Sequence, residues 1–132
     1  MAALDTNVLL RFLLQDDTAQ SALATQLIRR ARDTGEALFV PLSVTLELEW
    51  VLRSRFDLDK VAVAQTFAAL LQTVELRFQD TGALEWALSS FEDSAANFAD
   101  CIHAALALQA GEQPLWTFDR SASKLEGAQR LS

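Results

Sequence analysis

Cysteine, histidine and positive charge are all scarce in this chain of 132 residues. It contains one cysteine, Cys101, and one histidine, His103. A single cysteine excludes an internal disulfide, and the chain has no cluster of thiolates and imidazoles of the kind that holds zinc. The formal net charge of −7 differs from the basic footprint usual in proteins that bind nucleic acids. Bound divalent cations would reverse the local potential that a phosphate meets, and a basic partner is the other implication of this acidity.

Long apolar segments are also missing. No apolar run approaches the roughly 20 residues that a membrane-spanning helix needs, and Asp5, Asn7 and Arg11 interrupt the apolar start of the chain, which argues against a signal peptide. We therefore expect a cytoplasmic protein without a membrane association. Apolar residues make up 51% of the chain and charged residues 22%, which is typical of a globular protein and predicts one domain over residues 1–132.

Short apolar segments alternate with segments of helical periodicity. Strands are predicted at residues 1–4, 37–40, 73–78 and 115–118, of which the first two are expected to be buried and 73–78 half-buried. Helices are predicted from a cap at Asn7, from residue 18 to about 33, from a cap at Ser43, and over residues 59–71, 81–91 and 97–110. The tail, residues 124–132, is ambiguous. This alternation predicts an α/β fold in which a parallel sheet has helices on both faces.

The helix predicted from about residue 43 carries two glutamates in different positions. Glu47 comes three residues after Val44 and four before Val51, so we expect its carboxylate along the buried edge of the apolar stripe. Glu49 is expected to face solvent and to pair with Arg53, four residues later. Because burying an unpaired carboxylate is costly, Glu47 is the candidate functional residue of the two.

Three aspartates lie where strands end or helices begin. Asp5 and Asp119 each directly follow an apolar strand, and Asp100 is in the first turn of the helix predicted from Asn97, where it can also simply complement the helix dipole. The carboxyl ends of parallel strands and the helices that follow them meet at one edge of a sheet, so these aspartates and Glu47 are expected to converge. Four carboxylates in one place need a compensating cation, and hard oxygen ligands favour Mg²⁺ or Mn²⁺.

The same residues lie in four short motifs. These are LDTNVL at residues 4–9, PLS at 41–43 leading to ELEWVL at 47–52, FADCIHAA at 98–105, and TFD at 117–119. In this order and at these separations the chain resembles a PIN domain, and specifically the toxin nucleases of VapBC toxin–antitoxin pairs. The resemblance implies a three-layer α/β/α fold with a short-stranded, mainly parallel central sheet. It also implies endoribonuclease activity toward RNA that depends on Mg²⁺ or Mn²⁺, and a cognate antitoxin protein as partner; a homodimer is the further expected assembly.

The resemblance assigns roles to particular residues. The catalytic and metal-binding quartet falls on Asp5, Glu47, Asp100 and Asp119. Asn7 and Thr117 match polar positions that orient an acid or a bound water, although a helix cap and a strand-end hydroxyl explain them equally well. Some family members carry a further acid or asparagine shortly after the fourth acid. Here residues 121–123 are Ser-Ala-Ser, so Asp119 has no such neighbour.

Other interpretations remain open. A phosphotransfer enzyme with Asp5 as nucleophile, or a receiver domain, would need a second acid close to Asp5 and a lysine near the site. This chain has Thr6 and Asn7 after Asp5, and Arg120 after the late strand. A PIN-like scaffold without catalysis is the third alternative. Candidate phosphate contacts are Arg11, Arg53, Arg55 and Arg120, and candidate hydrophobic contacts for a partner are Leu46, Trp50 and Phe56.

Overall fold

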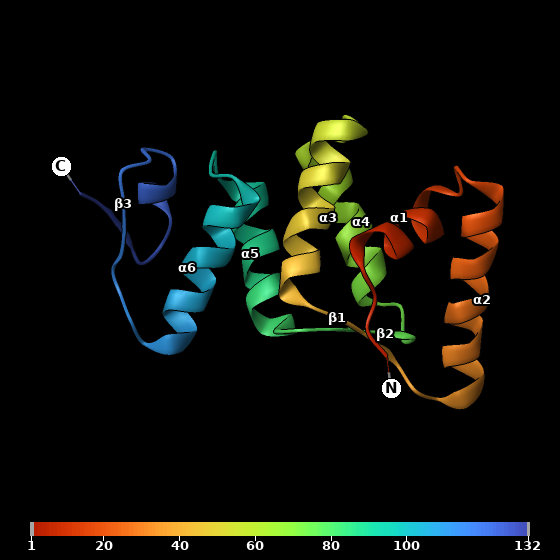
Figure 1. Ribbon diagram of the computed structural model, residues 1–132. Helices are drawn as coiled ribbons and strands as arrows, with labels where there is room; N and C mark the ends of the chain where they lie inside the picture. Colours follow the sequence, from red (N-terminus) through yellow and green to blue (C-terminus); the bar gives the residue numbers. More distant parts are fainter. Residues whose placement is uncertain (1, 132) are drawn as a thin grey trace. The chain divides into compact units, whose positions relative to one another are not determined.

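The computed structural model describes residues 2–131, and the chain divides into two compact units. Unit 1 is Met1–Gln79 and unit 2 is Asp80–Ser132. The elements of unit 1 are labelled in Figure 1 and comprise α1 (Thr6–Leu14), α2 (Thr18–Thr34), β1 (Leu38–Val40), α3 (Leu42–Arg55), α4 (Lys60–Leu71) and β2 (Leu76–Phe78). The elements of unit 2 are α5 (Thr81–Asp93), α6 (Phe98–Ala110), β3 (Leu115–Thr117), the short 3₁₀ helix η1 (Ala122–Lys124) and β4 (Ala128–Arg130).

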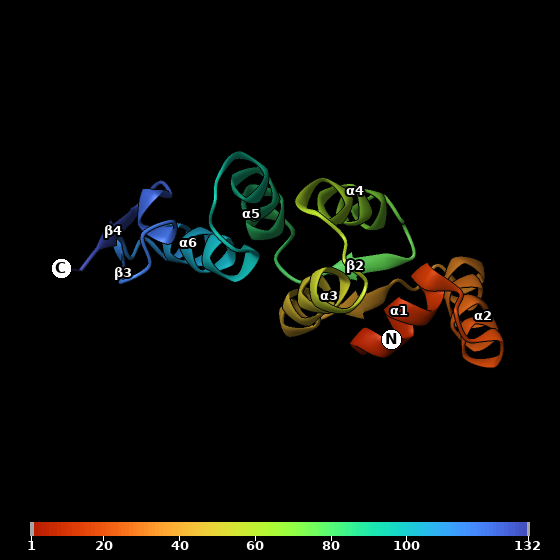
Figure 2. The ribbon, with the colours of Figure 1, turned by 90° about the horizontal axis from the view of Figure 1, so that it is seen from above.

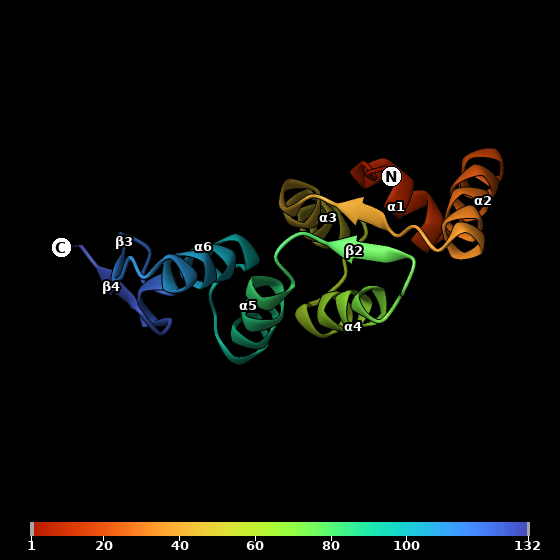
Figure 3. The same cartoon turned by 90° about the horizontal axis from the view of Figure 1, so that it is seen from below.

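The sheet of unit 1 is short and parallel. Strand β1 pairs with β2 on one edge, and on its other edge Phe39 forms an isolated parallel bridge with Ala3. Leu38 and Val40 of β1, and Leu76 and Phe78 of β2, are all buried. In Figure 1 the helices α1, α3 and α4 lie above these strands, and Figures 2 and 3, from opposite sides, show α4 next to β2 and α3 next to β1. Of the alternate residues, Phe39 is half-buried and Arg77 is exposed, with the Arg77 guanidinium 4.7 Å from the centroid of the Phe39 ring, so the core of unit 1 lies mainly on the other face of the strands.

Helix ends in unit 1 depart from the predicted caps at two places. Asp5 caps α1, because its Oδ1 accepts a hydrogen bond from the Thr6 backbone N–H at 2.7 Å; the predicted cap at Asn7 is wrong. Helix α3 begins after Pro41 without a side-chain cap, and the predicted cap at Ser43 is wrong because that residue already lies inside the helix. The Oε1 of Gln79 instead accepts from the Leu42 N–H, at 2.9 Å.

Unit 2 contains a pair of antiparallel helices and a second small sheet. Helices α5 and α6 are joined by a short connection, and the rings of Phe91 and Phe98 pack edge to face with centroids 5.6 Å apart. Asn97 caps α6 as the sequence predicts, with its Oδ1 accepting from the Asp100 N–H at 2.8 Å. Strand β3 pairs in parallel with β4, so the ambiguous tail, residues 124–132, contains the last residue of η1 and a strand.

The predicted strands are shorter in the structure than in the sequence pattern. Each named strand has three residues, and the first predicted strand is reduced to the bridge at Ala3, with Met1 outside the described residues. The α/β class with short parallel strands is confirmed. One domain over residues 1–132 stays a prediction. Among residues 2–131, no helix combines the length and the apolar character needed to cross a bilayer.

Candidate active site

In unit 1 a threonine connects two acids of the predicted quartet. Asp5 follows the bridge strand and Glu47 lies in the second turn of α3. The Thr6 backbone N–H donates to Asp5 Oδ1 at 2.7 Å, and the Thr6 hydroxyl donates to Glu47 Oε1. Thr6 itself is only 4% exposed, whereas both acids are exposed. The α1–α3 packing therefore holds two carboxylates on either side of one buried threonine.

The predicted orientation of the α3 glutamates is wrong. Glu47 is exposed, and Glu49 is the buried one, with 3% of its surface accessible. The predicted pairing of Glu49 with Arg53 is confirmed, at 2.9 Å between Oε2 and Nε. The physical reason is that Thr45 and Leu52 are buried together with Val44, Leu48 and Val51, so the buried arc of α3 extends to the Glu49 side. Glu47 stays a candidate through its contact with Thr6 and not through burial.

In unit 2 Asp100 lies in the first turn of α6. Its backbone N–H donates a hydrogen bond to the Asn97 side chain, and Asp100 is partly exposed. An acid in this position is also favourable to the helix dipole, so the local geometry supports either role for Asp100.

Asp119 and Thr117 are linked at the end of β3. The Thr117 hydroxyl accepts from the Asp119 N–H at 3.0 Å, and Asp119 Oδ1 accepts from the Ala122 N–H at 2.8 Å. Asp119 thereby fixes the turn into η1, although it is itself exposed to solvent. Thr117 thus has the strand-end role that the sequence left open, as a partner of the Asp119 backbone.

The four predicted acids are divided equally between the units. Unit 1 holds Asp5 and Glu47, and unit 2 holds Asp100 and Asp119. Within the described part of either unit, no three His, Cys, Asp or Glu side chains lie close enough together to bind a metal ion. The convergence of all four carboxylates stays a prediction.

The donor atoms nevertheless fit the expected ion. In unit 1 the available groups are the carboxylates of Asp5 and Glu47 and the hydroxyl between them, all oxygen. In unit 2 Cys101 is fully buried, and His103 is exposed with no second histidine in the chain. An all-oxygen donor set suits Mg²⁺ or Mn²⁺ better than Zn²⁺.

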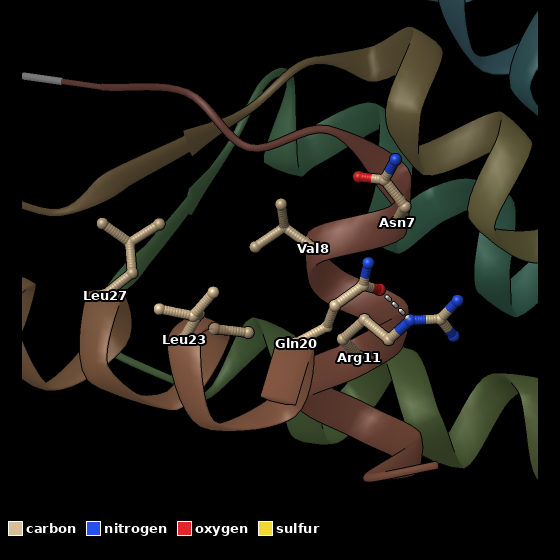
Figure 4. Close-up of a pocket in the computed structure, with 7 residues that line it drawn as sticks. Asn7, Val8, Arg11, Gln20, Leu23 and Leu27 are labelled. Carbon is tan, nitrogen blue, oxygen red and sulfur yellow. Dashed lines mark hydrogen bonds between the residues drawn. The ribbon is translucent and has the colours of Figure 1, made fainter. Parts of the chain in front are cut away.

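Asn7 and Arg11 border a groove between α1 and α2. Figure 4 shows these side chains with Gln20 of α2, whose Oε1 accepts from Arg11 Nε at 2.6 Å. Arg11 also pairs with Asp16 at 3.1 Å. The groove has a volume of about 270 Å³ and is lined by Asn7, Val8, Arg11, Gln20, Leu23, Ala24 and Leu27. Two of the candidate phosphate contacts, Arg11 and Arg53, are therefore already engaged by acids of their own unit.

Two polar residues near this edge were not singled out by the sequence pattern. Thr6 lies between Asp5 and Asn7, which the sequence did single out. It differs from a surface threonine because it is buried at the first position of α1. Gln79 directly follows β2, and its side chain accepts a hydrogen bond from the backbone at the start of α3. Only the parallel pairing of β1 and β2 brings Gln79 there, so no local signal could have identified it.

Comparison with known proteins extends over both units. The family model of the PIN domain matches residues 2–128, a range that includes all four predicted acids. A curated relative is the VapC ribonuclease of Aquifex aeolicus (strain VF5), which is 25% identical over 125 residues. The aligned region covers 95% of this chain and 92% of that relative.

Proposed function

The chain belongs to the PIN-domain family, and we propose that it is a metal-dependent endoribonuclease that hydrolyses RNA phosphodiester bonds. The observation that carries this proposal is the link from Asp5 through Thr6 to Glu47, which holds together two acids from separate helical elements. The name of its Aquifex relative, a ribonuclease, supports RNA as the substrate. Family membership favours this activity over a receiver domain or an aspartate-based phosphotransfer enzyme.

We propose that the four acids hold one or two Mg²⁺ or Mn²⁺ ions. When bound, such an ion stabilises negative charge on a phosphate and lowers the pKa of water, which is the chemistry that phosphodiester hydrolysis needs. Asp5, Glu47, Asp100 and Asp119 would supply oxygen ligands. Asn7 and Thr117 would support them, Thr117 through its hydrogen bond to the Asp119 backbone. No side chain of the chain has to act as a nucleophile.

The test is cleavage of total RNA by the purified chain with Mg²⁺, with Mn²⁺ and with EDTA. We expect fragments with either metal and none with the chelator. Glu47→Gln should be inactive, since the amide keeps an acceptor for Thr6 but removes the charge. Cleavage that survives EDTA, or that is equal in Glu47→Gln, would contradict the proposal, and absence of cleavage with metal binding retained would leave a PIN-like scaffold.

We further propose that the chain is the toxin of a toxin–antitoxin pair and acts in the cytoplasm as a homodimer. A partner that inhibits it is expected to be basic, because the chain carries a net charge of −7. Trp50 is 52% exposed and Phe56 39% exposed on and after α3, so both can contribute hydrophobic contacts that charge pairing alone does not provide. Leu46 is partly buried on the same helix.

Expression with and without the protein encoded beside this gene tests the pair. The chain alone should arrest growth, and co-expression should restore growth and yield a complex. Sedimentation of the isolated chain measures whether it is a dimer. No growth arrest and no complex would reject the toxin proposal while leaving the nuclease proposal to the RNA assay.

A further inference from the structure

The Thr6 hydroxyl has an unusual partner for a threonine in a helix. Three other helical or helix-end threonines, Thr45, Thr66 and Thr73, each donate to the backbone carbonyl four residues earlier, at distances of 3.5, 2.8 and 3.0 Å. That contact is the ordinary local option for a threonine hydroxyl in a helix. Thr6 instead donates to a carboxylate 41 residues away in the sequence.

The position of Thr6 in α1 accounts for the difference. It is the first residue of the helix, so the carbonyl four residues before it does not belong to the helix. Its backbone N–H is already taken by Asp5 Oδ1, and its side chain is buried between α1 and α3. With the backbone fixed in this way, the hydroxyl is directed across to α3 and not along its own helix.

We infer that Thr6 is a positioning residue whose hydroxyl fixes the Glu47 carboxylate relative to Asp5. Glu47 is an exposed, flexible side chain, and a single hydrogen bond from a buried and immobile donor reduces the number of orientations it adopts. One Glu47 oxygen is engaged by Thr6, which determines how the second oxygen is presented to an ion. The inferred effect on metal binding rests on the proposed function, whereas the hydrogen bond between Thr6 and Glu47 is a contact within unit 1.

The test compares Thr6→Val, which keeps the shape and removes the hydroxyl, with Thr6→Ser, which keeps the hydroxyl. Thr45→Val is the matched control, since Thr45 is also fully buried in unit 1 but donates only to the Pro41 carbonyl. The first measurement is Mn²⁺ affinity by titration calorimetry, which requires no cleavage. We expect Thr6→Val to weaken Mn²⁺ binding about 10-fold or more, as is usual for groups that orient a metal ligand. Thr6→Ser and Thr45→Val should remain close to the original chain.

The second measurement asks whether Thr6 acts through Glu47. In a Glu47→Ala background, Thr6→Val should cause little further loss of Mn²⁺ affinity, because the side chain that it positions is gone. In RNA cleavage, Thr6→Val should lower kcat with KM nearly unchanged. The inference would be overturned if the losses in the double variant were additive, or if Thr6→Val and Thr45→Val lost affinity equally. It would also be overturned if Thr6→Ser failed to retain affinity, or if the chain bound no Mn²⁺. A chain that binds Mn²⁺ but cuts no RNA would reject the nuclease proposal alone, and the affinities would still decide the role of Thr6.

Discussion

Unit 1 and unit 2 differ in charge and in where they place polar side chains. Unit 1 contains eight Lys and Arg against ten Asp and Glu, a net charge of −2, whereas unit 2 contains three against eight, a net charge of −5. Among residues 2–131, the buried polar or charged residues all lie in unit 1, and they are Thr6, Ser21, Thr45 and Glu49. The less acidic unit is therefore the one with polar contacts inside its core.

The hydrogen bonds around the candidate acids differ in the same way. In unit 1 the contact of Thr6 with Glu47 joins two helices that are distant in the sequence. In unit 2 the contacts of Asn97 with Asp100 and of Asp119 with Ala122 each span three residues. The geometry of Glu47 thus depends on tertiary packing, whereas Asp5, next to Thr6 in the sequence, and the unit 2 acids depend on local caps.

The largest effect is expected from replacing each acid by its amide. The substitutions are Asp5→Asn, Glu47→Gln, Asp100→Asn and Asp119→Asn, and each removes the charge that would hold the ion. At Asp5, Glu47 and Asp119 the amide also preserves the oxygen that accepts a hydrogen bond. Since ion-based stabilisation of charge is worth several kcal/mol and about 1.4 kcal/mol is tenfold in rate, we expect RNA cleavage to fall about 100-fold or more.

Asp119→Ala sharpens this comparison between the units. It removes the charge and also the acceptor for the Ala122 N–H, so it should lower stability where Asp119→Asn does not. If the two unit 1 amides abolished cleavage and the two unit 2 amides left it intact, the four acids would not form one site.

Metal binding should also be visible in stability. An ion that binds only the folded chain raises the free energy of unfolding by about 2.7 kcal/mol at 100 times its dissociation constant. We expect Mg²⁺ and Mn²⁺ to raise the melting temperature with the logarithm of their concentration, and Glu47→Gln to lose most of this increase. Thermal unfolding by circular dichroism measures it. A full increase in Glu47→Gln would place the ions elsewhere.

The α3 helix shows what the sequence pattern could not decide. At 3.6 residues per turn, Glu47 and Glu49 lie about 100° to either side of the buried Leu48. The spacing of Glu47 from Val44 and Val51 is matched by the spacing of Glu49 from Thr45 and Leu52. Periodicity therefore locates the buried centre of the helix but not which flank is covered, because that depends on the elements packed against α3.

Local features of the fold were predictable because their causes are local. The start of α6 at Asn97 is as predicted, since the cap that begins this helix acts within one helical turn. Strands β1, β2 and β3 were placed within a few residues by their apolar or alternating patterns, whereas β4 lies in the tail that the sequence left ambiguous. The Thr6–Glu47 and Gln79–Leu42 contacts were not predicted, because they form only once distant segments pair.

The ion pair between Glu49 and Arg53 in unit 1 has one buried member, Glu49. Substitutions at its two members are therefore expected to change stability by different amounts. Arg53→Met would leave the Glu49 carboxylate buried without its partner, and we expect it to lower the free energy of unfolding by about 2 kcal/mol. This lies below the range for fully buried pairs because the Arg53 side chain is 44% exposed. Glu49→Leu removes the buried charge itself and should change stability by less than about 1 kcal/mol.

Denaturant unfolding measures both changes, with cleavage as a second readout. Neither Arg53→Met nor Glu49→Leu should reduce the cleavage rate of the folded protein by more than about twofold, because neither residue is one of the four acids proposed to hold the ion. A large loss of cleavage with unchanged stability in Glu49→Leu would instead assign Glu49 to the catalytic machinery in place of Glu47.

The smallest effect is expected from the cap of α6. Asn97→Ala removes the acceptor for the Asp100 N–H and should lower stability by about 1 kcal/mol, the usual value of a side-chain N-cap. Asn97→Asp keeps the acceptor and adds a favourable charge at the helix N-terminus, so it should retain or slightly raise stability. Because Asp100 belongs to the same first turn, Asn97→Ala should also reduce cleavage modestly. The control is Ser43→Ala, inside α3, a helix that begins without a side-chain cap. It should change neither stability nor cleavage. If Asn97→Ala left both stability and cleavage unchanged, the acids of unit 2 would not depend on local caps, and the contrast with the packing-dependent contact of Thr6 and Glu47 would fail.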